Sequence, residues 1–286
     1  YGLSLALQVV EVRRQVLEGM QHHLADAKAL EANGIIAKGE RLYAEVHTAE
    51  AEREYLAAQK TAATLNSALC NTLNTETTYQ PISSMFILSQ IEDVDHFKQL
   101  ALNNNPQLRQ VGLKKDLAVE GVRLQRADFA PQVALMGGAS FYNYQVTPLM
   151  PRWAVGAGVS FKIFDGLNRE YKFSAAKSQV RQVEALNVKA QHDILTLIDK
   201  LYNEMTTYNE QLPSIDAAYN FAAEYLRIKE EAFKEGAAPS SDVVDAQLNL
   251  AKIKTERLQA AYYYDLMLAR LLEACGESEM LTEYAR

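Results

Sequence analysis

Side chains able to carry out chemistry are few in this sequence. Its five histidines are scattered, and the adjacent His22 and His23 point to different sides of a helix. His192 and Asp193 lie in a long helical stretch that offers no cysteine or serine in register. The metalloprotease, nucleophile-elbow, P-loop and dinucleotide-binding motifs are absent. We therefore expect no enzyme activity, no cofactor and no metal site.

Two short turns with carboxylates beside them are better functional candidates. Each begins at a glycine, Gly34 or Gly236, which can end the incoming helix, and Ser240 or Ser241 can cap the helix after the second turn. The carboxylates that follow the turns are Glu40, Asp242 and Asp245. Acidic residues in a first helical turn stabilise the helix by about 0.3–1 kcal/mol through its dipole, and residue types alone favour that structural explanation.

Long helices must position these turns. Three stretches lack glycine and proline: the residues between Gly39 and Thr72, those from Leu167 to Leu212, and those from Ser240 to Cys275. They are rich in helix-forming residues, and they exceed the mean helix length of about 11–12 residues, which predicts long bundled helices. The third stretch carries two adjacent apolar seams, so its helix can pack against neighbours on both sides.

An internal repeat relates the two turns. A shift of 202 residues places Gly34 on Gly236 and Glu54 on Glu256, and the layout of helix, glycine turn and helix is shared. Between the two hairpins, a polar linker follows Thr75. Two further helical segments are expected at 94–104 and 106–128, with Pro106 in a first helical turn.

Residues 129–164 differ from the helical stretches in composition, because only Arg152 and Lys162 are charged. Two runs alternate apolar with small or polar residues, and each is near the length of about 9–11 residues of a membrane-spanning strand. The residues expected to face lipid are Val133, Leu135, Phe141, Trp153, Val155, Val159, Phe161 and Ile163. Trp153, Tyr142 and Tyr144 suit an interfacial aromatic belt. Alternation alone also fits a soluble hairpin packed on helices. In a membrane, one hairpin would need further strands to close a barrel.

Composition excludes several classes. With 29 basic and 36 acidic residues among 286, the net charge is −7, and no basic stripe suggests nucleic-acid binding. No apolar run approaches the roughly 20 residues of a transmembrane helix. Cys70 and Cys275 lack zinc-ribbon or disulfide-scaffold spacing, so we expect small buried residues. The start at Tyr1 resembles neither an initiator methionine nor a signal peptide, so we expect a piece of a longer protein.

A series of short motifs occurs in a fixed order along the chain. They are LALNNNPQL at 100–108, PQVAL at 131–135, WAVGAGVSF at 153–161 followed by FDG at 164–166, and Gly236 followed by DVVDA at 242–246. Each motif alone is weak. Their order and spacing, together with the repeat, resemble the TolC family of outer-membrane efflux and secretion channels over nearly the whole chain.

The resemblance implies a mainly α fold with long antiparallel coiled-coil hairpins, a tunnel-type α-barrel, plus one β-hairpin of a trimeric transmembrane β-barrel. In this family two repeats make a protomer, and here the first lacks its N-terminal part. The implied divisions are a partial first repeat with a periplasmic hairpin at 1–74, an equatorial linker at 75–93, helices of the second repeat at 94–130, the barrel hairpin at 131–164, the second periplasmic hairpin at 165–276 and a tail at 277–286.

The resemblance also implies roles for the two turns. The residues implied to contact a periplasmic adaptor are Gly34, Ile35, Ile36, Ala37, Gly236, Ala237, Ala238 and Pro239, with Ile35 and Ile36 exposed. Glu40, Asp242 and Asp245 would belong to the periplasmic gate, where three-fold repetition crowds like charges and attracts cations. Ala238 stands where some members carry a basic gate-latching residue.

The implied function is the outer-membrane channel of a tripartite efflux or type I secretion system. Such a channel is a homotrimeric passive duct, set in outer-membrane lipid and coupled to an adaptor and an inner-membrane pump, and it binds no nucleic acid. The alternative is a soluble or periplasmic helical-bundle interaction protein without channel activity, in which a helix would cover the apolar hairpin face. A membrane-remodelling coiled coil would need a basic face that the sequence lacks.

Overall fold

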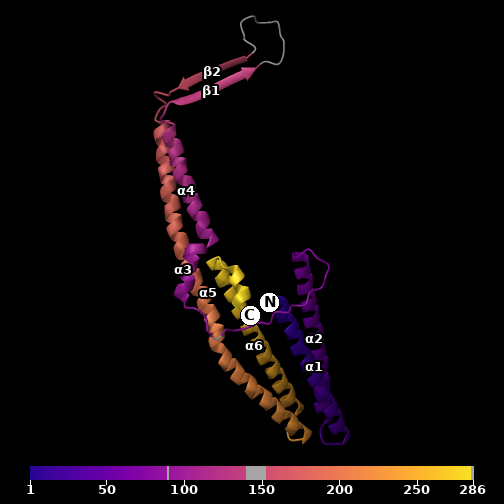
Figure 1. Cartoon of the computed structure of the whole chain (residues 1–286). Helices are drawn as coiled ribbons and strands as arrows, with labels where there is room; N and C mark the ends of the chain where they lie inside the picture. Colours follow the sequence, from indigo (N-terminus) through magenta and orange to yellow (C-terminus); the bar gives the residue numbers. More distant parts are fainter. Residues whose placement is uncertain (89, 140–152, 285–286) are drawn as a thin grey trace. The chain divides into compact units, whose positions relative to one another are not determined.

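The computed structural model describes residues 1–88, 90–139 and 153–284 (Figure 1). Its elements are α1 (Gly2–Ala32), α2 (Lys38–Thr72), α3 (Val94–Asn104), α4 (Pro106–Ala127), β1 (Gln132–Ala139), β2 (Trp153–Ser160), α5 (Asn168–Lys234), α6 (Ser240–Cys275), a 3-10 turn η1 (Ser278–Met280) and α7 (Leu281–Tyr284). Two compact units form, residues 1–101 with 197–286, and residues 102–196. The predicted helical hairpins and β-hairpin are confirmed.

In the first unit, α1 packs against α2 and α6, and α2 also contacts α6. One core cluster joins these helices, and its buried members are Val12, Val16 and Met20 of α1, Ala51 of α2, and Val244 and Ala251 of α6. The buried residues of α2 are all alanines, Ala44, Ala51 and Ala62. Small side chains at these positions let neighbouring helices approach α2 closely.

The two turns share one backbone geometry. Gly34 and Gly236 each have a φ of +72°, in the left-handed region that favours glycine. The N–H of Gly34 donates to the carbonyl of Glu31 at 2.9 Å, and the N–H of Ile35 donates to the carbonyl of Leu30 at 2.9 Å. The second turn repeats both bonds, with the same residue spacing. This is the Schellman helix ending, and it confirms that glycine terminates both incoming helices.

The predicted serine caps are wrong. The residue before α6 is Pro239, whose backbone is extended and whose side chain accepts no hydrogen bond, and Ser240 is already the first helical residue. Proline suits this place because its fixed φ and missing N–H cost nothing outside the helix. The hydroxyl of Ser240 is therefore free to bond to another helix rather than to its own.

The start of α4 accounts for the Asn-Pro-x-Leu motif. Asn105 is the N-cap, and its Oδ1 accepts a hydrogen bond of 2.9 Å from the N–H of Leu108. Pro106 occupies the first turn, where no N–H is needed, and the side chain of Leu108 is buried. Each motif residue thus has a local physical role.

Helix α5 is longer than the predicted glycine- and proline-free stretch, because it continues through Pro213 to Lys234. A proline inside a helix removes one backbone hydrogen bond. Neighbouring turns and packing of the buried Ala222 and Phe233 sustain the helix beyond it. Within the described part of the chain, no helix combines the length and the apolarity needed to cross a bilayer.

The two cysteines differ from each other. Cys275 is buried as expected, whereas Cys70 is partly exposed, and both are free thiols. Cys70 lies near the end of α2, and its thiol contacts Asn66 Oδ1 one turn back and the carbonyl of Thr77 in the chain that follows.

Candidate functional site

The three predicted gate carboxylates have three different environments. Asp242 Oδ2 forms an ion pair with Lys229 Nζ of α5 at 2.6 Å. Glu40 Oε2 accepts a hydrogen bond of 2.6 Å from the backbone N–H of Ser240. This N–H lies in the first turn of α6, where backbone N–H groups have no partner within the helix. Asp245 is exposed, and no cation within the described residues pairs with it. The structure therefore brings Glu40 to α6, 200 residues away in sequence.

A buried polar link joins the two hairpins at the same place. His23 Nε2 of α1 and Ser240 Oγ share a hydrogen bond of 2.6 Å. The centroid of the His23 ring lies 4.4 Å from the centroid of the Phe233 ring. Burial lowers the pKa of His23, so the ring is neutral around pH 7. Ser240 thus contacts α1 through its hydroxyl and α2 through its N–H. His22, by contrast, is exposed, as expected for two adjacent helical residues.

An apolar cluster supports this link. Its buried members are Ala27, Ala44, Phe233 and Val243, from α1, α2, α5 and α6 in turn. The turns also touch directly, because a Cβ on Gly236 would lie 3.0 Å from Ile35 Cγ2. Ile35 is 55% exposed as predicted, but Ile36 packs against the cluster and is only partly exposed. The expectation of an exposed Ile36 is therefore wrong, because its side chain packs on a cluster to which both hairpins contribute.

The β-hairpin places the predicted apolar residues on one face. Strands β1 and β2 are antiparallel, and the register pairs Val133 with Val159 and Gly137 with Val155. Residues opposite each other share a face, so the apolar sets of both strands coincide. Leu135 is 81% exposed, and no helix covers the face within the described residues. The apolar members that lie on this face in the strands are Val133, Leu135, Trp153, Val155 and Val159.

Some predicted strand residues lie elsewhere. Strand β2 ends at Ser160, so Phe161 and Ile163 follow it as exposed residues outside the ladder. Pairing stops there because β1 begins at Gln132, the partner of Ser160. Phe141, Tyr142 and Tyr144 lie outside the described residues.

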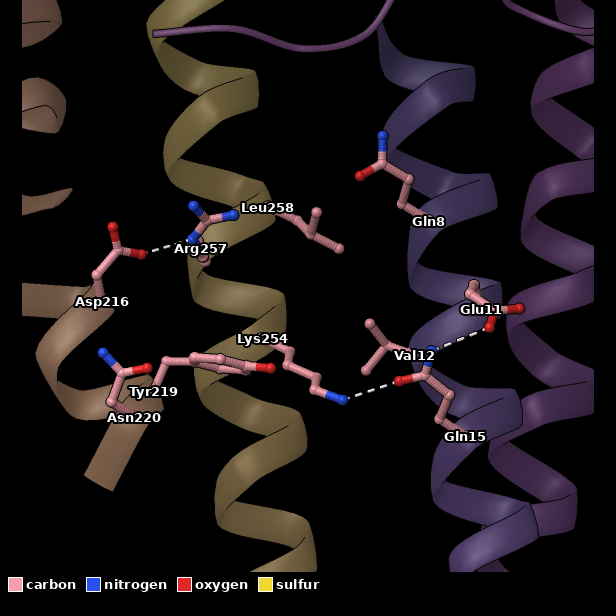
Figure 2. A pocket seen from close by; sticks show the side chains of 10 residues that line it. All are labelled: Gln8, Glu11, Val12, Gln15, Asp216, Tyr219, Asn220, Lys254, Arg257 and Leu258. Atoms are coloured by element: carbon pink, nitrogen blue, oxygen red, sulfur yellow. Dashed lines mark hydrogen bonds and ion pairs between the residues drawn. The ribbon is translucent and has the colours of Figure 1, made fainter. Parts of the chain in front are cut away.

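A groove of about 670 Å³ lies farther along the first hairpin, between α1, α5 and α6 (Figure 2). Two cross-helix contacts border it, Arg257 Nε with Asp216 Oδ1 at 2.6 Å and Lys254 Nζ with Gln15 Oε1 at 2.8 Å. Hydrogen bonds from Arg14 and Gln15 lower the pKa of Glu11, which lines the groove, to about 2. No cluster of three metal-binding side chains occurs in the described parts of the chain.

Sequence reasoning missed Asp265, which is fully buried in α6. Its Oδ2 accepts a hydrogen bond of 3.3 Å from the N–H of Phe86 in the linker, and burial raises the pKa of Asp265 to about 7. A signal was present, because residue 265 continues the four-three spacing of Leu258 and Tyr262. A carboxylate in an apolar seam indicates a buried polar contact.

Comparisons with known proteins agree with this architecture. Residues 98–277 match the family model described as "Outer membrane efflux protein". The chain is 24% identical over 173 residues to the outer membrane protein TolC of Vibrio cholerae, which is 59% of this chain and 39% of that protein. The chain therefore spans well under half the length of this relative.

Two solved structures have the same fold. The outer membrane protein VceC of Vibrio cholerae matches with a TM-score of 0.79 at 18% identity, over 96% of this chain and 67% of VceC. The outer membrane channel CmeC of Campylobacter jejuni matches with a TM-score of 0.77 at 15% identity, over 99% of this chain and 64% of CmeC. The fold class predicted from the sequence is thus confirmed. Because the family match covers more than half of the chain, this protein belongs to the outer membrane efflux protein family.

Proposed function

We propose that this chain is part of a passive exit channel of the outer membrane, the outermost component of a tripartite efflux or type I secretion system. Transport energy would come from an inner-membrane pump, through a periplasmic adaptor. The family and its solved relatives are channels rather than enzymes, which supports a duct that catalyses nothing.

The apolar face of the β-hairpin carries this proposal. Its large side chains, such as Leu135 and Val155, are at least 70% exposed. Water would disfavour such a face, whereas lipid accepts it. The two strands also leave unpaired edges, which bilayer hydrocarbon does not tolerate. Further strands must close the sheet, so we assign residues 131–164 to a barrel shared by three copies.

The helical hairpins supply the periplasmic part of the proposal. We assign residues 1–74 and 165–276 to a tunnel, residues 75–93 and 94–130 to its equatorial part, and 277–286 to a tail. The two turns offer matched ends at which a helical adaptor can dock, with Ile35 exposed and Gly236 beside it. Glu40, Asp242 and Asp245 lie at the same ends, where a trimer would bring three copies around one aperture.

The test uses the full-length parent protein. Membranes are separated on a density gradient, and the detergent-extracted protein is sized and reconstituted in planar bilayers. An outer-membrane trimer that conducts ions supports the channel. A soluble monomer or dimer refutes it and leaves the helical-bundle alternative. Crosslinking of the adaptor from Ile35→Cys, with the exposed mid-helix Leu56→Cys as control, then tests the docking ends.

A further inference from the structure

The linker between α2 and α3 is attached to α6 through a short apolar stretch, residues 85–88. Residues 76–84 before it are exposed, whereas all four residues of the stretch are partly buried. The N–H of Phe86 donates a hydrogen bond of 3.3 Å to Asp265 Oδ2 of α6. The Phe86 ring also meets the Tyr1 ring edge-on, with 6.5 Å between centroids. Asp265 is therefore a side chain of α6 that holds the backbone of the linker.

The carboxyl group of Asp265 is poorly satisfied in this position. Its side chain is fully buried, and Oδ1 has no hydrogen-bond partner within the described residues. An ionised carboxylate can accept about four hydrogen bonds, whereas Oδ2 receives one long bond from Phe86. Burial raises the pKa of Asp265 to about 7, because so few donors compensate the charged form. The neutral form is therefore favoured while the linker stays in place.

The titratable groups around Asp265 do not offset its charge. Burial raises the pKa of three tyrosines in this region, so their phenols stay neutral at pH 7: Tyr1, Tyr202 and Tyr264. The carboxylate of Glu92 accepts a hydrogen bond of 2.8 Å from the Tyr284 hydroxyl. The positive amino group of Tyr1 lowers the pKa of Asp265. Where further residues precede Tyr1, that group is a neutral peptide N–H, and the protonated form of Asp265 is favoured further.

We propose that Asp265 is a proton-dependent clasp for the linker: its protonated form holds residues 85–88 against α6, and its ionisation releases them. A released linker admits water to Asp265, whose pKa then returns to the ordinary value of 3.8. A carboxyl group with a raised pKa in the closed state stabilises that state at low pH, and this stabilisation is lost as the pH rises toward about 7. The clasp lies on the segment that connects the two helical hairpins, and it does not depend on the proposed channel function.

Thiol accessibility in the full-length protein tests the clasp. Leu88→Cys reports on the partly buried stretch, and Ile82→Cys is the matched control, because Ile82 is 99% exposed in the same linker. Both are made in a Cys70→Ser background and labelled with a maleimide. The two thiols share the pH dependence of the labelling reaction, so the ratio of the Leu88→Cys rate to the Ile82→Cys rate measures release. This ratio should rise at least about tenfold from about pH 5.5 to about pH 8.

Variants of the carboxylates identify the titrating group. Asp265→Asn keeps the shape and the acceptor oxygen but cannot ionise, so the ratio should stay low and independent of pH. Glu273→Gln is the control, because Glu273 is an exposed carboxylate of the same helix, and it should keep the rise. The native thiol of Cys275 is buried at the end of α6 and reports on opening of the whole helical unit. It should react slowly at both pH values.

Three outcomes would overturn the proposal. One is a labelling ratio that does not change with pH while Asp265 is present, a result that does not require any Asp265 variant to fold. Another is a rise that persists in Asp265→Asn, because another group would then control the linker. The last is equal acceleration of Cys275 and Leu88→Cys, because the whole unit would then open rather than the linker alone.

Discussion

Substitution of Leu135 by arginine tests the membrane assignment of the β-hairpin. Leu135 lies in the middle of β1, on the face that carries Val133, Val155 and Val159. Its side chain is 81% exposed, so the substitution disturbs no packing within the described residues. If this face meets lipid, arginine near the bilayer midplane costs about 2–4 kcal/mol per chain. In a water-exposed hairpin the same substitution stays within about 0.5 kcal/mol.

Met136→Arg is the matched control, because Met136 is the next residue on the same strand and lies on the opposite face. Its side chain is also exposed, at 64%. Arginine there would face the interior of a barrel, where polar residues are accepted. Both variants add one positive charge to the same strand at an exposed position, so the face that they alter is the main difference between them.

The assay is a urea titration of the purified full-length protein folding into lipid vesicles, followed by tryptophan fluorescence. Leu135→Arg should reduce the folding free energy by about 2–4 kcal/mol, and Met136→Arg by less than about 1 kcal/mol. The yield of trimer in the outer membrane should follow the same order. Equal effects of the two variants would refute the argument that this face contacts lipid.

Three further predictions concern the helical unit and are measured by thermal melting of helical circular dichroism. Phe233→Ala should destabilise it by about 3–5 kcal/mol because Phe233 is buried among four helices, whereas the exposed Phe221→Ala should have little effect. Burial lowers the pKa of His23, so the unfolded chain takes up the proton first and stability should fall as the pH drops below the ordinary value of 6.5. His23→Gln should weaken that decline, and an unchanged profile would contradict the assignment. Burial raises the pKa of Asp265 from 3.8 to about 7, so stability is lost as the pH rises through this window. Asp265→Asn should remove the loss, and a variant that still loses stability between these pH values would point to another group.

The local elements of the fold could be predicted because each follows from neighbouring residues. Gly34 and Gly236 end helices through their positive φ, and Pro106 starts one through its fixed φ. Alternation in 132–139 and 153–160 determined which residues share a strand face. The wrong prediction of a serine cap also depended on neighbouring residues. Ser240 looked like a cap, although Pro239 already occupied the cap position and left Ser240 inside the helix.

The partners of the site side chains could not be predicted. Ser240 has a residue type that suits a cap, yet its hydroxyl contacts His23, which is 217 residues away. Glu40 and Asp242 occupy equivalent repeat positions, yet one serves the start of α6 and the other pairs with Lys229. Residue type and spacing do not distinguish them, because a carboxylate near a helix start is favourable in either role.

The sequence by itself determined the helices, the turns, the strand faces and the resemblance to one channel family, since these depend on backbone preferences and on periodicity. Only the tertiary structure decided that Asp242 pairs with Lys229, that Asp245 has no ion-pair partner within the described residues and that Ile36 is partly buried. The physical reason is that charge compensation and burial depend on which helices pack side by side. That packing brings together residues far apart in the chain, such as the buried alanines of α2 and the cluster that contains Phe233.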